Sequence, residues 1–160
     1  MIVPAVLVAA FTVHGGAGAG RWDQLQISSD GPKPPAPAYR PFVYGRFEWV
    51  PSSLPLRLDL SLTAYSSVNR AGLTGEGLLW AGIDFGPHPW RHGPRVGVGL
   101  VDPAVGAHYP HVGMTVGLAY RLGIPLWGGW LHVDPEASAG FQGEIYRELR
   151  VRIGYEWRVL

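Results

Sequence analysis

The sequence predicts an all-β fold in which eight antiparallel strands close into an up-and-down barrel. The 160 residues suffice for one domain, and 23 Gly and 15 Pro interrupt the chain too often for long helices. Several segments alternate apolar and polar side chains with the period of two that strands require. Charged residues make up only 16% of the chain, whereas an ordinary soluble surface carries about 25–35%. This shortage of charge favours a barrel whose outer wall faces lipid, that is, a transmembrane one.

Composition excludes several other classes of protein. The chain is 47% hydrophobic and 12% aromatic, which is too apolar for a disordered protein. It has no cysteine, so neither a disulfide scaffold nor a thiolate zinc site is available. The formal net charge is +1 and Lys33 is the single lysine, so bulk charge attracts no nucleic acid. We therefore expect no nucleic-acid partner.

The first 19 residues differ in composition from the rest of the chain. Residues 1–19 carry no charged side chain, and an apolar run over 2–13 is followed by small residues ending in Ala17-Gly18-Ala19. This layout is typical of a secretory signal peptide with its cleavage site. We expect a cleavable leader over 1–19 and a single barrel domain over 20–160. The same residues leave open an N-terminal strand or helix that stays in the fold.

The first four expected strands are residues 22–28, 42–50, 56–65 and 77–85. The first is marked only weakly. In the second, apolar residues such as Phe47 alternate with Arg46 and Glu48, and in the third, leucines alternate with polar residues throughout. The fourth is apolar on both faces around Trp80, so its facing stays open.

The last four expected strands are residues 95–101, 112–122, 127–133 and 145–159. In the fifth, valines alternate with Gly97 and Gly99, small residues that relieve crowding within a sheet. The sixth alternates apolar with small or polar residues, and the seventh follows a short turn. The eighth alternates apolar with charged residues over most of its length. These segments complete the eight strands.

The alternation of apolar and polar residues does not by itself show which face of the barrel contacts water. A soluble lipocalin-like barrel that binds an apolar ligand and a membrane barrel with an apolar exterior give the same pattern. Two observations favour the membrane barrel. The polar faces are rich in small residues and carry no lysine, and the aromatic residues Trp49, Tyr65, Tyr155 and Trp157 lie near strand ends, where membrane interfaces collect them.

Connection lengths supply a third observation. If the chain enters from the periplasm, the expected outer connections are 29–41, 66–76, 102–111 and 134–143, and the inner ones are 51–55, 86–94 and 123–126. All four outer connections exceed every inner one in this assignment. Long external loops and short periplasmic turns are typical of bacterial outer-membrane barrels.

The end of the chain carries a short pattern. Polar Arg152, then Gly154, then the hydrophobic Trp157 and Val159 follow one another at fixed spacing. This pattern resembles the C-terminal assembly signal of outer-membrane β-barrel proteins. Over residues 20–160 the chain resembles the small eight-stranded barrels of Gram-negative outer membranes in architecture. The resemblance implies a lipid bilayer and the outer-membrane insertion machinery as partners.

In a barrel of this kind the polar faces would fill the interior. The interior polar network is expected to comprise Arg46, Glu48, Arg57, Asp59, Asp84, Arg121, Glu148, Arg150, Arg152 and Glu156. Eight strands enclose a space only wide enough for side chains, so no open pore is expected. Charges removed from water must be paired and hydrogen-bonded, so we expect these residues to form a structural plug.

Little in the sequence points to metal, cofactor or catalytic chemistry. The histidine pairs His88/His92 and His108/His111 fall at opposite barrel ends, so we expect no metal site and no cofactor. Small barrels also include lipid-A-modifying enzymes, for which the candidates are His132, Glu136 and Ser138 on the last external loop, or His111 with Ser66. Nothing in the sequence places either set within hydrogen-bonding reach, so we assign no catalytic residues.

These observations favour an outer-membrane β-barrel with a side-chain-filled interior, acting as a structural or surface-interaction protein. Its external loops would be the variable part that contacts an extracellular ligand of unknown kind. Two alternatives remain open. One is a secreted or periplasmic soluble barrel with an apolar ligand inside, and the other is a lipid-A-modifying outer-membrane enzyme.

Overall fold

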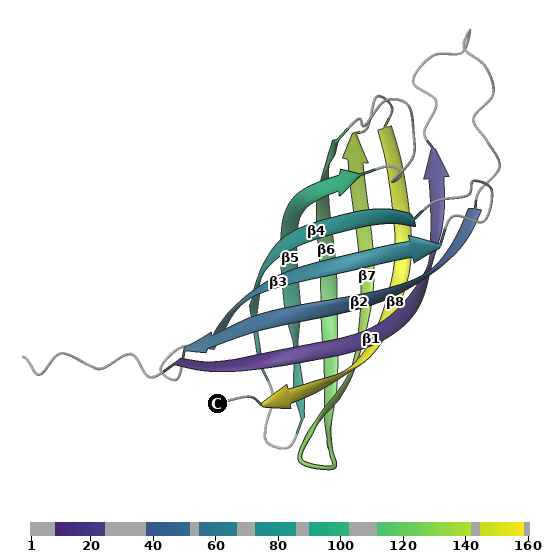
Figure 1. Ribbon diagram of the computed structural model, residues 1–160. Helices are drawn as coiled ribbons and strands as arrows, with labels where there is room; N and C mark the ends of the chain where they lie inside the picture. Colours follow the sequence, from purple (N-terminus) through teal and green to yellow (C-terminus); the bar gives the residue numbers. More distant parts are fainter. Residues whose placement is uncertain are drawn as a thin grey trace, which may run out of the picture.

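Eight antiparallel strands make up the ordered body of the protein (Figure 1). The computed structural model describes residues 9–24, 38–51, 55–66, 73–85, 90–102, 112–141 and 145–158. The strands are β1 (Ala9–Gln24), β2 (Ala38–Pro51), β3 (Leu56–Ser66), β4 (Leu73–Ile83), β5 (Arg91–Asp102), β6 (Gly113–Leu126), β7 (Gly129–Phe141) and β8 (Ile145–Arg158). None of the described residues belongs to a helix long and apolar enough to cross a membrane.

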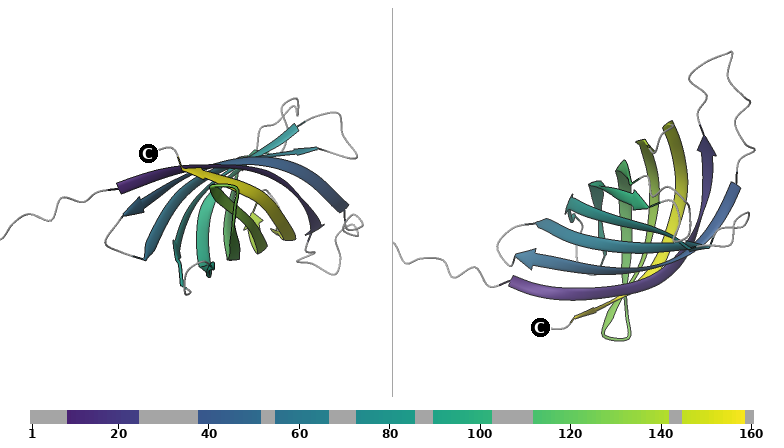
Figure 2. Two further views of the ribbon diagram at one scale, coloured as in Figure 1. Left: turned by 90° about the horizontal axis from the view of Figure 1, so that it is seen from below. Right: turned by 45° about the horizontal axis from the view of Figure 1, so that its top comes forward.

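Each strand pairs with its sequence neighbours, and β1 pairs with β8 to close the barrel. The strands are strongly tilted, so that β2 and β3 cross in front of β7 and β8 (Figures 1 and 2). The closed up-and-down barrel predicted from the alternation is confirmed. With no open edge, the strands can satisfy their backbone hydrogen bonds within the sheet, as a structure in lipid must.

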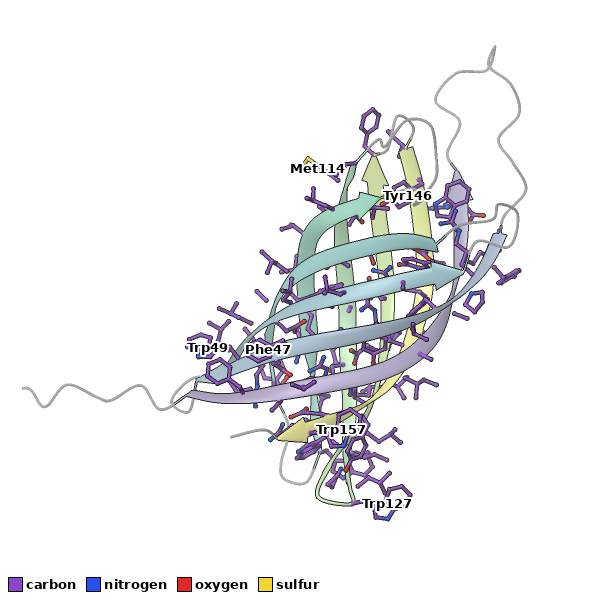
Figure 3. All side chains as sticks on the ribbon, viewed as in Figure 1. Phe47, Trp49, Met114, Trp127, Tyr146 and Trp157 are labelled. Atoms are coloured by element: carbon purple, nitrogen blue, oxygen red, sulfur yellow. The ribbon has the colours of Figure 1, made fainter. Side chains whose placement is uncertain are left out.

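The facing of β3 separates the membrane barrel from the soluble one. Its leucines point outward, and Leu62 keeps 62% of its surface exposed, whereas Asp59 and Ser61 are buried inside. The same division runs round the wall: the outward residues of β5, β6 and β8 are mainly valine, leucine and isoleucine, and those of β2 include Val43 and Phe47. The exterior is apolar and the interior polar (Figure 3), which is the reverse of a soluble barrel that holds an apolar ligand.

The one strand whose facing the sequence left open, β4, places Leu78 and Trp80 inside the barrel. The indole of Trp80 fits because the facing strands carry glycine at Gly97 and Gly117. A Cβ atom added at these glycines would lie 2.6 and 2.8 Å from the Trp80 ring. Glycine in β5 and β6 therefore makes room for the largest interior side chain.

The first strand differs from the expected one. Instead of residues 22–28, β1 spans Ala9–Gln24 and pairs with both β2 and β8. The cleavage site expected after Ala19 lies inside this strand. Its Gly- and Ala-rich sequence carries almost no alternation of polarity, which is why the pattern missed it.

The seventh strand is longer than expected and changes the connection lengths. β7 continues through Phe141, so residues 134–141 are strand and the connection to β8 is only 142–144. Pro135 lies in the connection expected over 134–143, but it stays in the sheet. The β6–β7 ladder skips the pairs that would join Tyr120 to Pro135 and Arg121 to Asp134. At the barrel end that contains the β7–β8 connection, two connections, 25–37 and 103–112, are longer than any at the opposite end, rather than all four.

We call the barrel end with the N-terminus of β1 and the C-terminus of β8 the terminus end, and the opposite one the loop end. Outward aromatic side chains gather at the terminus end, where Figure 3 shows Trp49, Trp127 and Trp157. Trp49 and Trp157 are two of the four aromatic residues that the sequence placed near strand ends. Tyr65 is an exception: it lies on the same face of β3 as Asp59 and is buried inside the barrel.

Candidate functional site: the charged interior

The interior holds the polar residues that the sequence analysis assigned to it. Eight of them are buried on the inner face: Arg46, Glu48, Asp59, Arg121, Glu148, Arg150, Arg152 and Glu156. The remaining two, Arg57 and Asp84, pair with each other at 3.0 Å and keep side-chain exposures of 12% and 11%. The structure thus brings all ten to the inner face.

One group of interior residues, the terminus-end cluster, balances three arginines against three carboxylates. Its members are Arg46, Arg95, Arg121, Glu48, Asp59 and Asp134. Arg46 pairs with Asp59 at 3.1 Å and with Asp134 at 2.9 Å. Arg95 pairs with Asp59 at 2.6 Å and with Glu48 at 3.1 Å, and Arg121 with Glu48 at 3.0 Å and Asp134 at 3.3 Å. Each charge touches two opposite charges from other strands, so the cluster cross-links the wall from inside.

A second group, the loop-end cluster, continues the network toward the other end. Its members are Glu76, Glu136, Glu148, Arg150 and Arg152, together with the hydroxyl of Tyr65. Arg150 pairs with Glu76 at 2.6 Å and with Glu136, and donates to Tyr65. Arg152 pairs with Glu136 at 2.8 Å, and Tyr65 donates to Glu76 at 2.9 Å. Three carboxylates face two arginines in this group.

Aromatic side chains occupy the space beside the two clusters. The Arg152 guanidinium lies 5.1 Å from the centre of the Tyr44 ring and 5.9 Å from that of Trp80. The indole N–H of Trp80 donates to Ser61 at 3.0 Å. Asp134 and Glu136 are consecutive inward residues of β7, so the two clusters are contiguous. Charged and aromatic side chains together fill the interior along its axis.

Two interior histidines form a contact that the sequence analysis did not anticipate. His14 on β1 and His132 on β7 are buried, with the ring nitrogens Nδ1 and Nε2 3.2 Å apart. His14 Nε2 lies 2.8 Å from Glu48, and His132 Nδ1 lies 3.4 Å from Asp134. These contacts link the histidines to the terminus-end cluster.

One set of described side chains has the donor types and spacing of a metal site. Ligand atoms of His14, Glu48 and Glu156 lie within 4.8 Å of one another. Glu48 already pairs with Arg95 and Arg121, and Glu156 lies 3.4 Å from Arg91. Since the carboxylates are already neutralised by arginine, a divalent cation would add uncompensated charge, and the set does not fit a metal.

Several interior residues escaped prediction for identifiable reasons. His14 falls in the segment assigned to the leader, and His132, Asp134 and Glu136 fall in or beside the segment assigned to a loop. Glu76 lies one residue before the expected fourth strand. Extending each strand by its own alternation, with Glu76 two positions before Leu78, would have found it.

The first set of catalytic candidates does not come together. His132, Glu136 and Ser138 are inward residues of β7, not members of an external loop. His132 and Ser138 are six residues apart on one extended strand, which separates them by roughly 20 Å. That distance rules out a direct hydrogen bond between the two. His111 lies outside the described residues, and so do His88 and His108.

The residues of the expected assembly signal lie on β8. Arg152 and Gly154 face inward, where a Cβ atom on Gly154 would lie 2.2 Å from the Tyr44 hydroxyl, and Trp157 faces outward at the terminus end. Val159 lies outside the described residues. Gly154 therefore has a packing role beside Tyr44.

No family model matches this chain, and no curated protein matches it. Among solved structures, Neisserial surface protein A matches with a TM-score of 0.63 at 14% identity, over 93% of this chain and 97% of that one. The N-terminal β-barrel domain of Pseudomonas aeruginosa OprF matches with a TM-score of 0.53 at 10% identity, over 89% and 99%. Ail, the attachment invasion locus protein of Yersinia pestis, matches with 0.50 at 11%, over 93% and 97%. In fold, the chain is a small eight-stranded barrel of the transmembrane kind.

Proposed function

We propose that the protein is a structural and surface-interaction protein of the bacterial outer membrane, with a barrel that conducts no solute. The observation that carries the proposal is the interior ion-pair network. Arginines and carboxylates from β2 to β8 meet across the interior at 2.6–3.3 Å, beside Trp80. A channel needs a continuous aqueous path, whereas these side chains occupy the space that eight strands enclose.

The apolar exterior supports a membrane location. Exposed valine, leucine and isoleucine side chains form its outward surface, and a closed antiparallel barrel is a fold able to cross a bilayer. The likeness to solved outer-membrane barrels supports the outer membrane of a Gram-negative cell. The longer connections, 25–37 and 103–112, belong to the loop end, which faces outward in barrels of this kind. Contact with other molecules would fall to these connections.

Conductance tests the closed interior. The full chain, folded in detergent and added to planar lipid bilayers, should give no discrete current steps at moderate voltage. Folding is verified on gels, where a folded barrel migrates differently before and after boiling. Stable current steps from the protein that passes this gel test would overturn the closed-interior proposal.

The orientation is tested with single cysteines, since the natural chain has none. Ala36→Cys places a thiol in the connection between β1 and β2 at the loop end, and Ser53→Cys places one in the connection between β2 and β3 at the terminus end. In intact cells a membrane-impermeant maleimide should label the first variant and spare the second, and both should react after lysis. Labelling of Ser53→Cys alone in intact cells would reverse the orientation.

A further inference from the structure

The outward wall over β1, β7 and β8 is shaped differently from the rest of the barrel. β8 presents a ridge of Leu149, Val151 and Ile153. On both sides the outward residues are small: Ala17 and Ala19 on β1, and Pro135, Ala137 and Ala139 on β7. Ala19 lies opposite Val151 and Ala137 opposite Leu149 in the two ladders. The ridge therefore separates two shallow troughs.

A depression of about 720 Å³ covers this part of the wall. Leu118 and Tyr120 on β6 bound it on one side, and Tyr39 on β2 bounds it on the other. Its lining is almost entirely apolar. On β3, in contrast, leucine occupies successive outward positions from Leu56 to Leu62. The apolar lining of the depression suits acyl chains that pack against the protein.

Positive charge lies at the loop end of the same troughs. Arg21 and Arg147 point outward from β1 and β8, on either side of Asp23. Their Nε atoms lie 3.4 and 3.5 Å from the two oxygens of that carboxylate, and their side chains are 48% and 60% exposed. Two guanidinium groups against one carboxylate leave an excess of one positive charge. Exposed guanidinium groups are well suited to binding phosphate oxygens in pairs.

A second groove on the outer wall lacks this combination. It has a volume of about 580 Å³ and lies over β5, β6 and β7 near the terminus end, with Trp90, Ile124 and Leu131 in its lining. Its arginine, Arg91, stacks on the Trp130 ring at 4.0 Å and pairs with interior Glu156. The positive charge of Arg91 at that groove is therefore already paired within the protein.

We propose that the wall formed by β1, β7 and β8 binds an anionic membrane lipid that carries phosphate and several acyl chains. Arg21 and Arg147 hold the phosphate, and the troughs on either side of the β8 ridge hold the chains. The apolar lining and the charge at its loop end match the two parts of such a lipid. The site goes beyond the proposed function, because a closed structural barrel needs no specific lipid.

Native mass spectrometry of the full chain in neutral-detergent micelles tests the site. The probe is diphosphoryl lipid A, with phosphatidylcholine as the zwitterionic comparison lipid. The wild-type protein should retain one lipid A molecule at detergent-stripping energies at which phosphatidylcholine is lost. The double variant Arg21→Gln/Arg147→Gln should need at least tenfold more lipid A for the same occupancy.

A second variant tests whether the troughs contribute to lipid binding independently of the arginine charges. Ala137→Trp fills one trough without altering a charge, and it should also lower lipid A occupancy, whereas Val98→Trp on the outward face of β5 should not. All variants are first shown to fold by the heat-dependent gel shift, so loss of binding is distinct from loss of the barrel.

Three results would each overturn the lipid site. They are equal retention of the two lipids, unchanged binding in both the arginine and the Ala137 variants, and displacement of lipid A by millimolar inorganic phosphate. The last would indicate a site for free phosphate. None of these results bears on conductance, so the proposed function is tested separately.

Discussion

Interior glycines decide which large side chains the barrel can hold. Gly97 and Gly117 face Trp80, and Gly16 and Gly154 face Tyr44, each at a distance where a Cβ atom would collide with the ring or its hydroxyl. Glycine has a low strand propensity, so the many glycines in these strands reduce the local stability of the sheet. The compensation is room for two aromatic residues inside a narrow barrel.

The Gly97→Val substitution should therefore destabilise the barrel through Trp80. Overpacking of a filled interior costs roughly 1–3 kcal/mol, and the added Cβ would lie 2.6 Å from the indole. The measurement is the urea midpoint of refolded protein in micelles. Gly45→Val, on an outward position with its nearest neighbouring atom 4.0 Å away, is the control. If the cause is steric, Trp80→Ala should relieve part of the loss in the double variant.

Arg150 should be among the interior charges that are most costly to remove. Arg150→Met leaves Glu76 and Glu136 buried with fewer partners, and removing one partner of a buried pair costs about 3–5 kcal/mol. Arg57→Met should cost less, because the Arg57–Asp84 pair is partly exposed and Asp84 keeps a second arginine, Arg95, at 3.3 Å. Adding Glu76→Gln to Arg150→Met should recover stability in the same urea titration. Equal losses at Arg57 and Arg150 would contradict the burial argument.

At the scale of elements, alternation predicted some strands well and others poorly. β3, β6 and β8 have large apolar side chains at most of their outward positions, so their facing follows from the sequence. In β1 the inward residues Gly16, Gly18 and Gly20 and the outward alanines are all small, so no contrast marks its faces. In β7, Asp134-Pro135-Glu136 has the composition of a turn, although Pro135 points outward and the acids point inward.

The mature protein should retain residues 9–19, against the expected cleavage after Ala19. Cleavage there would leave 20–24 as the remainder of β1, and a tilted transmembrane strand needs about 9–11 residues. The ladders to β2 and β8 would lose most of their pairs. Peptide mass spectrometry of protein purified from membranes should find the segment intact. A folded mature protein that begins at Gly20 would contradict this expectation.

A charge on the outward wall of the barrel should destabilise it according to the depth of the position in the bilayer. Leu60→Arg, near the middle of β3, should cost roughly 2–4 kcal/mol in lipid, and Phe141→Arg at a strand end roughly 0–1 kcal/mol. Both side chains point outward. Reversible unfolding in phospholipid vesicles measures the difference. Equal effects at the two positions would mean that the outward wall does not face a bilayer.

At the scale of the whole molecule, the two ends of the barrel differ. Trp49, Trp127 and Trp157 mark the terminus end, and Trp127 is 90% exposed at the turn between β6 and β7. Indole rings favour the boundary between lipid headgroups and acyl chains. The aromatic residues therefore fix the depth of the terminus end in the membrane.

Tryptophan fluorescence should report this position. In vesicles, quenchers attached near the headgroup should reduce the emission more than quenchers at the bilayer centre, because the outward indoles lie at the terminus end. Trp80, enclosed by the barrel, should be little affected by either quencher. Replacing Trp49, Trp90, Trp127 and Trp157 by Phe should remove most of the depth dependence. Stronger quenching from the centre would place these residues away from the interface.

The sequence predicts which residues fill the interior better than it predicts which of them contact one another. The alternation of inward and outward positions along each strand assigns Arg46, Glu48 and Asp59 to the inner face, because lipid excludes charged side chains from the outer one. Which carboxylate each arginine meets depends on register and on the curvature of the closed sheet, which one strand's sequence does not contain. The His14–His132 contact joins β1 to β7, which lie on either side of β8, so it too depends on the closed sheet and not on the sequence of one strand.

The β1–β8 ladder also governs how the chain can be assembled. The other seven ladders join neighbours in sequence, but this one brings Ala17 to Ile153 and so closes almost the entire chain into a loop. Contacts between distant segments form slowly. Until they form, β1 and β8 are free edges that can pair with a second chain and nucleate aggregates. We expect any factor that assists insertion to shield these two strands until they meet, with its sequence signal in the last strand.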